Sequence, residues 1–113
     1  MFPQKNRLGT WEFSEVMNKG KGYSDSVLFI KIMKNSVGHT RIGVGVSKGL
    51  ATKPAKRNYY KRILRHILKD VLSEKDIPYD IIAIAREGAQ DKKIRELKEN
   101  AKNILQKTPI FSK

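Results

Sequence analysis

The sequence contains no cysteine, and its only histidines are His39 and His66. The absence of cysteine excludes disulfides, thiolate metal sites and thiol nucleophiles, and two histidines are too few for a histidine-rich metal site. Acidic residues are also scarce, at 11 against 24 lysines and arginines, which leaves a net charge of +13. Because an excess of one sign repels itself in a compact fold, this balance favours a polyanionic partner.

Long hydrophobic runs are missing as well. No apolar stretch approaches the roughly 20 residues that a transmembrane helix needs, and residues 1–10 carry no apolar signal core. We therefore expect a cytoplasmic protein with no membrane partner, which leaves nucleic acid as the leading polyanion. The 113 residues fit one domain, residues 1–113, and a hydrophobic content of 39% suffices for a modest core.

The first half of the chain predicts one short helix and three strands. The helix is expected after Gly9, with Thr10 as its N-cap. Residues 27–33 are rich in β-formers, and residues 41–47 alternate between apolar and small or polar side chains. We expect these two strands to form an antiparallel pair, with residues 23–26 as a further short strand.

The second half predicts a helix, a strand and a helix. Pro54 suits the first turn of a helix that runs to about residue 72, and a loop is expected at 73–78. Residues 80–86 are apolar on both faces, which is typical of a central or parallel strand. The last helix is expected to start near Asp91, and its apolar face comprises Ile94, Leu97, Ala101, Ile104 and Leu105. The order α-β-β-β-α-β-α predicts an α+β fold in which helices pack on a small mixed sheet.

The helix from position 54 carries the clearest functional signal. On a helical wheel of about 100° per residue, one side is apolar and comprises Tyr60, Ile63, Leu64, Ile67 and Val71. The opposite side carries Asn58, Lys61, Arg62, Arg65 and Lys69, and no carboxylate occurs anywhere from position 26 to 69. Cations at these spacings repel by a few tenths of a kcal/mol per pair, and a phosphate backbone would relieve that repulsion.

Two plainer interpretations of this helix remain. A solvated helix face is the commoner explanation of surface charge, but such faces ordinarily mix both signs. An interfacial membrane helix would carry large aromatic side chains on its apolar face, where this helix carries core-type residues. The pattern favours a polyanion, and charge alone does not separate RNA from DNA.

Several motifs together resemble the protein component of bacterial ribonuclease P. The central ones are Val46-Ser47-Lys48, Ala55-Lys56-Arg57-Asn58 and Lys61-Arg62-Ile63-Leu64-Arg65. Further segments agree in order and spacing: Arg7-Leu8, Glu12-Phe13, Val16-Met17, the strand from Arg41 to Ser47, and Ile82-Ala83-Ile84-Ala85-Arg86. The sequence departs from the family's pattern at Met17, Gly49, Tyr59 and His66.

The resemblance implies a subunit that joins a catalytic RNA and helps it cut the 5′ leader from precursor tRNA. It implies no required protein partner, no catalytic residue in the protein itself, and Mg²⁺ held mainly by the RNA of the holoenzyme. It also implies a fold like that of a ribosomal protein domain, with an uncommon left-handed β-α-β crossover. The residues alone would favour the right-handed crossover found in about 98% of cases.

The resemblance also implies which residues bind. The RNA subunit would be bound by Lys53, Lys56, Arg57, Asn58, Lys61, Arg62, Arg65 and Lys69. A cleft between the first helix and the sheet would hold the leader against Phe13, Met17, Leu28, Ile30, Ile82 and Ile84. From their positions at strand ends, and not from the resemblance, we expect further RNA contacts at Arg41, Ser47, Lys48 and Arg86.

Some of these assignments keep a structural alternative. Phe13 and Met17 lie one helical turn apart and could equally be core residues. Leu28 and Ile30 share one strand face, and Ile82 and Ile84 share another. One of these pairs should line the leader cleft, and the other should belong to the core. Gly43 and Gly45 favour close helix packing over close approach of a nucleic acid.

Two other functions remain open. A ribosomal or general structured-RNA-binding protein would show no preference for precursor over mature tRNA. A free-standing nuclease would need a base, a nucleophile or a metal site, and the scattered acids show no metal-ligand spacing.

Overall fold

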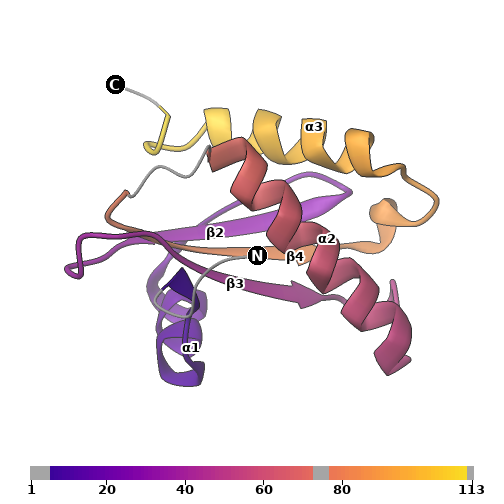
Figure 1. Cartoon of the computed structure of the whole chain (residues 1–113), viewed down its shortest axis with the longest axis horizontal. Coiled ribbons are helices and arrows are strands. Elements are labelled where there is room, and N and C mark those ends of the chain that lie inside the picture. Colours follow the sequence, from indigo (N-terminus) through magenta and orange to yellow (C-terminus); the bar gives the residue numbers. More distant parts are fainter. Residues whose placement is uncertain (1–5, 73–76, 112–113) are drawn as a thin grey trace.

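The computed structural model describes residues 6–72 and 77–111. Its elements are α1 (Thr10–Lys19), β1 (Lys21–Ser24), β2 (Leu28–Lys34), β3 (Arg41–Val46), α2 (Pro54–Leu72), β4 (Tyr79–Ala85), the short 3₁₀ helix η2 (Glu87–Ala89) and α3 (Ile94–Gln106) (Figure 1). The predicted order of helices and strands is confirmed. The predicted loop at 73–78 falls mostly outside the described residues.

The strands form one mixed sheet in the order β1-β2-β4-β3. The predicted pairing of residues 27–33 with 41–47 is wrong, because β4 lies between these two strands. It runs antiparallel to β2 and parallel to β3. Ile81 and Ile82 point to opposite faces of β4 and are both fully buried, so this strand gains most from the central position.

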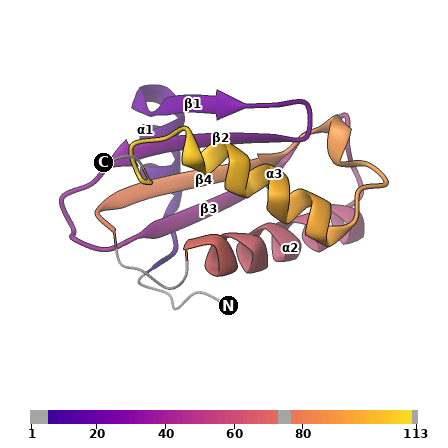
Figure 2. The ribbon, with the colours of Figure 1, turned by 90° about the horizontal axis from the view of Figure 1, so that it is seen from above.

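The connection from β3 through α2 to β4 is a left-handed crossover. Figure 2 views the sheet from the side of α2 and α3, with β3 and β4 both pointing to the right. In this view α2 lies on the viewer's side and β4 lies above β3. The crossover implied by the family resemblance is therefore present, against the general preference for the right-handed form.

The two faces of the sheet are covered differently. Helices α2 and α3 pack together on one face, and α1 lies across the other (Figures 1 and 2). The main core lies under α2 and α3, and its fully buried members include Leu28, Ile30, Ile67, Ile81 and Leu105. Under α1 the contact is smaller, with Val16 and Ile82 at its centre.

Two helix starts differ from the predictions. Thr10 is already helical and Gly9 is the cap, because the Gly9 carbonyl accepts a 2.9 Å hydrogen bond from the Phe13 amide. The last helix begins at Ile94, three residues later than expected, because Asp91 adopts a left-handed backbone conformation with φ of 64°. Ile94, expected on the buried face, is 47% exposed as a result of lying in this first turn.

Candidate nucleic-acid interface

Helix α2 separates its apolar and basic sides as the sequence predicts. Its buried residues are Tyr60, Ile63, Leu64, Ile67, Leu68 and Leu72. On the other side, Lys56, Asn58 and Arg62 are exposed, as is Lys53 directly before the helix, while Arg57, Lys61, Arg65 and Lys69 are half-buried. We call these eight residues the basic face of α2. Over residues 6–72 and 77–111, none of its cations forms an ion pair with a carboxylate.

Arg57 also has a structural contact. Its Nη1 donates a 2.9 Å hydrogen bond to the carbonyl oxygen of Ala51, which ties the start of α2 to the turn that follows β3. The neighbouring Tyr59 is 47% exposed and meets Tyr60 edge to face, with ring centroids 5.3 Å apart. Tyr59 therefore adds an exposed aromatic ring beside the cations.

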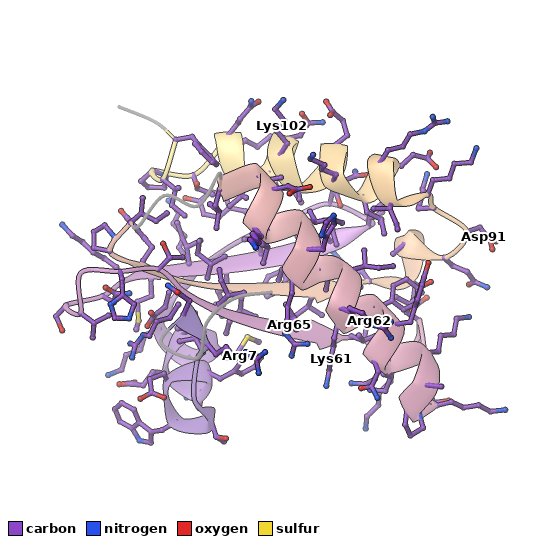
Figure 3. All side chains as sticks on the ribbon, viewed as in Figure 1. Arg7, Lys61, Arg62, Arg65, Asp91 and Lys102 are labelled. Atoms are coloured by element: carbon purple, nitrogen blue, oxygen red, sulfur yellow. The ribbon has the colours of Figure 1, made fainter. Side chains whose placement is uncertain are left out.

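A further cation, Arg7, approaches α2 from the N-terminal segment. The amide of Leu8 donates a 2.9 Å hydrogen bond to the Ile42 carbonyl, and Arg7 forms a parallel bridge with Ile42. Partial burial, and then the charge of Arg7, lower the pKa of Arg65 below its ordinary value. Figure 3 shows Arg7 and Arg65 directed toward the same region beside the β3 edge. Arg7 was not among the residues predicted for the site, although the Arg7-Leu8 pair was visible in the sequence.

The four residues predicted as further RNA contacts differ in exposure and in their hydrogen-bond partners. Arg41 has a structural role: its Nε and Nη2 bind the buried carboxylate of Asp80 at 2.8 and 2.9 Å. This hydrogen bonding raises the pKa of Arg41. Asn35 donates a third hydrogen bond to Asp80, at 2.8 Å. The Arg41 guanidinium therefore compensates a buried charge, and its contact with RNA stays a prediction.

Ser47, Lys48 and Arg86 lie at the ends of β3 and β4. Lys48 is exposed, whereas the Ser47 hydroxyl is enclosed. Arg86 is exposed, and its Nη1 donates a 2.8 Å hydrogen bond to the Asp25 carbonyl. The Asp25 carboxylate accepts hydrogen bonds from the amides of Val27 and Leu28 and from the Asn100 side chain. Burial acts to raise the pKa of Asp25, but these hydrogen bonds bring the net pKa below its ordinary value.

The predicted leader-binding residues divide between the two faces of the sheet. Leu28 and Ile30 are 0% exposed beneath α2 and α3, so they belong to the core and their assignment to the leader is wrong. Ile82 and Ile84 lie on the α1 side, where Ile82 is fully buried and Ile84 half-buried. The side-chain alternation of β2 and β4 decides this, since Leu28 and Ile30 pair with Ala85 and Ala83 on the α2 side.

Phe13 and Met17 are both half-buried on α1. The Phe13 ring lies over Gly43, where a Cβ would approach Cδ2 of the ring to 2.7 Å. Gly43 thus permits close helix packing, as predicted. A Cβ at Gly45 would meet only Ile84, at an ordinary 3.4 Å.

Two residues that were not predicted for the site, Phe29 and Lys31, share this face of β2. Phe29 is half-buried, and the Lys31 ammonium lies 5.9 Å from its ring centroid. Lys31 also donates a hydrogen bond to the Met17 carbonyl, which ties the sheet to the end of α1. The alternation of residues 28–34 in the sequence could have identified Phe29 and Lys31, because it places them on the strand face opposite the buried residues Leu28 and Ile30. We call Phe13, Met17, Phe29 and Ile84 the α1-side apolar surface.

The described residues contain no group of three or more histidine, cysteine, aspartate or glutamate side chains placed to hold a metal ion. No helix within these residues is both long and apolar enough to cross a bilayer.

Comparison with known proteins decides the family. The family model for ribonuclease P matches residues 2–109. The chain belongs to the ribonuclease P protein family. Membership makes it a tRNA-processing, RNA-binding protein by class. It is 36% identical over 113 residues to the ribonuclease P protein component of Pseudanabaena sp., covering 98% of this chain and 97% of the relative. It is 32% identical over 100 residues to that of Clostridioides difficile, covering 88% and 87%. The structure of the Staphylococcus aureus ribonuclease P protein superimposes with a TM-score of 0.81 at 26% identity, covering 95% of this chain and 98% of the other.

Gly49 lies beside the exposed side chain of Glu87. A Cβ at Gly49 would lie 2.0 Å from Oε1 of Glu87. Because this atom ends a flexible side chain, Glu87 can turn aside, and the structure does not explain the glycine at position 49.

Proposed function

We propose that the protein is the accessory subunit of a ribonuclease P holoenzyme. It binds the catalytic RNA through the basic face of α2 and contacts the 5′ leader of precursor tRNA through the α1-side apolar surface. The observation that carries this proposal is the basic face itself: a row of solvent-accessible cations without carboxylate partners among the described residues. Cations in this arrangement favour a ligand with closely spaced negative charges.

The leader assignment rests on the chemistry of the α1-side apolar surface. Phe13 and Phe29 are half-buried aromatic rings, and Lys31 adds a positive charge beside Phe29. Aromatic rings stack on unpaired bases without regard to sequence, at roughly 1–3 kcal/mol per base. Such a surface suits an enzyme that processes leaders of many sequences.

In this proposal the RNA supplies the cleavage chemistry and binds most of the Mg²⁺. The protein contributes cations that screen phosphate repulsion between the RNA subunit and the precursor. It should therefore lower the magnesium concentration at which the RNA cuts.

Reconstitution with a bacterial ribonuclease P RNA tests the proposal. Single alanine substitutions of Lys61, Arg62 and Arg65 should weaken binding to this RNA. The slope of log affinity against log salt should fall by roughly 0.7–0.9 for each phosphate that the variant no longer neutralises. Arg95 on α3 is exposed, and its alanine variant is the matched control that should leave both quantities unchanged. If all variants keep the wild-type affinity and slope, α2 is not the RNA interface.

Two further measurements separate the alternative functions. A general structured-RNA-binding protein would bind precursor and mature tRNA equally, alone or with the RNA subunit. A free-standing nuclease would cut precursor tRNA without added RNA. We expect leader removal only in the reconstituted complex, at a magnesium concentration too low for the RNA alone.

A further inference from the structure

The N-terminal segment of residues 6–8, which precedes α1, is fixed to the edge of the sheet. The Asn6 side chain is buried and donates a 2.6 Å hydrogen bond from Nδ2 to the Thr40 carbonyl. The Leu8 amide bonds the Ile42 carbonyl, and the Leu8 side chain packs beside Gly43. Because both neighbours of Arg7 are held, the position of its backbone is fixed, whereas its own side chain is exposed.

This arrangement brings Arg7 to the basic face of α2. Arg65 is half-buried, and Arg7 is the only charged group that affects its pKa among the causes resolved for the described residues. Lys61 lies one helical turn before Arg65, so the two side chains neighbour each other on the helix surface. In Figure 3 the side chains of Arg7 and Arg65 point toward the same region beside β3, and Lys61 extends from the same side of α2.

Among the described residues, no carboxylate lies close enough to pair with Arg7, Lys61 or Arg65. Like charges held together in this way repel, and an anion between them would remove the repulsion. Arginine forks bind phosphate bidentately, and lysine adds a point charge.

We propose that Arg7 and Arg65 form one phosphate-binding site, with Lys61 beside it, in which residues 6–8 and α2 bind the same backbone phosphate of an RNA. This inference rests on the proposed function in taking RNA as the source of the phosphate. It adds a binding residue outside α2, and it gives the fixed N-terminal segment a function: holding Arg7 within reach of a phosphate that α2 also contacts. Arg62 would contact a different phosphate.

The site can first be tested in the free protein, with inorganic phosphate as the probe. Arg7→Gln should raise the melting temperature in chloride by about 1 to 3 °C, because it removes a like-charge repulsion of a few tenths of a kcal/mol. Adding phosphate at constant ionic strength should stabilise the wild type more than Arg7→Gln. Arg95→Gln removes the same charge from α3 and should respond to phosphate as the wild type does. An equal phosphate response in wild type and Arg7→Gln would overturn the site.

A double-mutant cycle with ribonuclease P RNA tests the shared phosphate. Arg7→Gln and Arg65→Gln should each weaken binding roughly tenfold. The double variant should lose less than the product of the two, and its salt slope should fall by the amount expected for about one phosphate rather than two. Arg7→Gln paired with Arg62→Gln should be additive. Arg7→Lys, which keeps the charge without the fork, should recover part of the affinity.

The outcomes distinguish this inference from the proposed function. Loss of RNA binding in the Arg62 variant, with no effect of Arg7→Gln, refutes the shared site and leaves the α2 interface intact. Additive losses for Arg7 and Arg65 also refute it, because they indicate separate phosphates. Wild-type binding in every variant refutes the proposed interface as a whole.

Discussion

Truncating Phe13 to alanine tests whether the α1-side apolar surface binds the leader. The ring is half-buried and packs over Gly43. A fully buried phenylalanine truncated to alanine costs about 3–5 kcal/mol, so a ring exposed on one side should cost about 1.5–2.5 kcal/mol. For a domain of this size, that loss lowers the melting temperature by roughly 6–12 °C.

This loss is too small to unfold the protein at room temperature. A chain of 113 residues is expected to have a stability of roughly 6–17 kcal/mol. At least about 3 kcal/mol would therefore remain in Phe13→Ala, which keeps more than roughly 99% of the molecules folded. Any change in RNA binding then reports the missing ring and not a smaller folded fraction.

We expect the holoenzyme with Phe13→Ala to bind precursor tRNA more weakly by roughly 1–3 kcal/mol, and mature tRNA unchanged. Equilibrium binding of both tRNAs, together with a melting curve of the protein, measures this. Val16→Ala is the matched control, since Val16 is fully buried on the same helix and its loss should affect stability alone. Met17→Phe, which adds an aromatic ring to the α1-side apolar surface, should tighten precursor binding.

The opposite result would refute the reasoning. If Phe13→Ala binds precursor tRNA as tightly as the wild type while its melting temperature falls, then Phe13 is a packing residue only. Equal losses for precursor and mature tRNA would likewise show that the ring does not contact the leader. The leader would have to be bound elsewhere on the protein.

Three further predictions concern the scaffold. Gly43→Ala should destabilise by about 1–3 kcal/mol, because its Cβ would meet the Phe13 ring at 2.7 Å, whereas Gly45→Ala should be nearly neutral; equal urea midpoints for the two variants would contradict this. Asp80→Asn should cost about 2–4 kcal/mol in urea unfolding, because Arg41 then lacks its charged partner; a loss under about 1 kcal/mol would mean that the pair is replaceable. Asp25 has a folded-state pKa below its ordinary 3.8, so its stabilising contribution is present above that value and is lost as pH falls through the lower folded pKa. The stability difference between wild type and Asp25→Asn should therefore be largest near neutral pH and shrink toward pH 3, and a difference that stays constant over this range would show that Asp25 is not shifted.

The basic face of α2 was predictable because helix periodicity is a local property. Over 19 residues, the repeat of 3.6 places each side chain relative to its neighbours without knowledge of the rest of the chain. The same holds for the central position of β4, since a strand apolar on both faces must be covered on both. Family resemblance supplied the handedness of the crossover, which periodicity does not contain.

Which strand residues belong to the α1-side apolar surface could be known only from the tertiary structure. Leu28 and Ile82 are equally apolar in the sequence, and only the register and the placement of α1 put one in the core and the other beneath α1. Arg41 and Asp80 are 39 positions apart, and no local sequence pattern indicates that they pair across the parallel strands β3 and β4. Its place at a strand end was the only signal for Arg41, and that signal did not contain this ion pair.

Local periodicity thus determined which helix carries the cations and which strand is central, because those properties follow from the spacing of neighbouring residues. Tertiary structure alone decided which strand face meets α1, which arginine neutralises a buried acid, and that Arg7 approaches Arg65. Each of these depends on the packing of segments far apart in the chain, and packing is set by the total burial of the fold, not by any one segment.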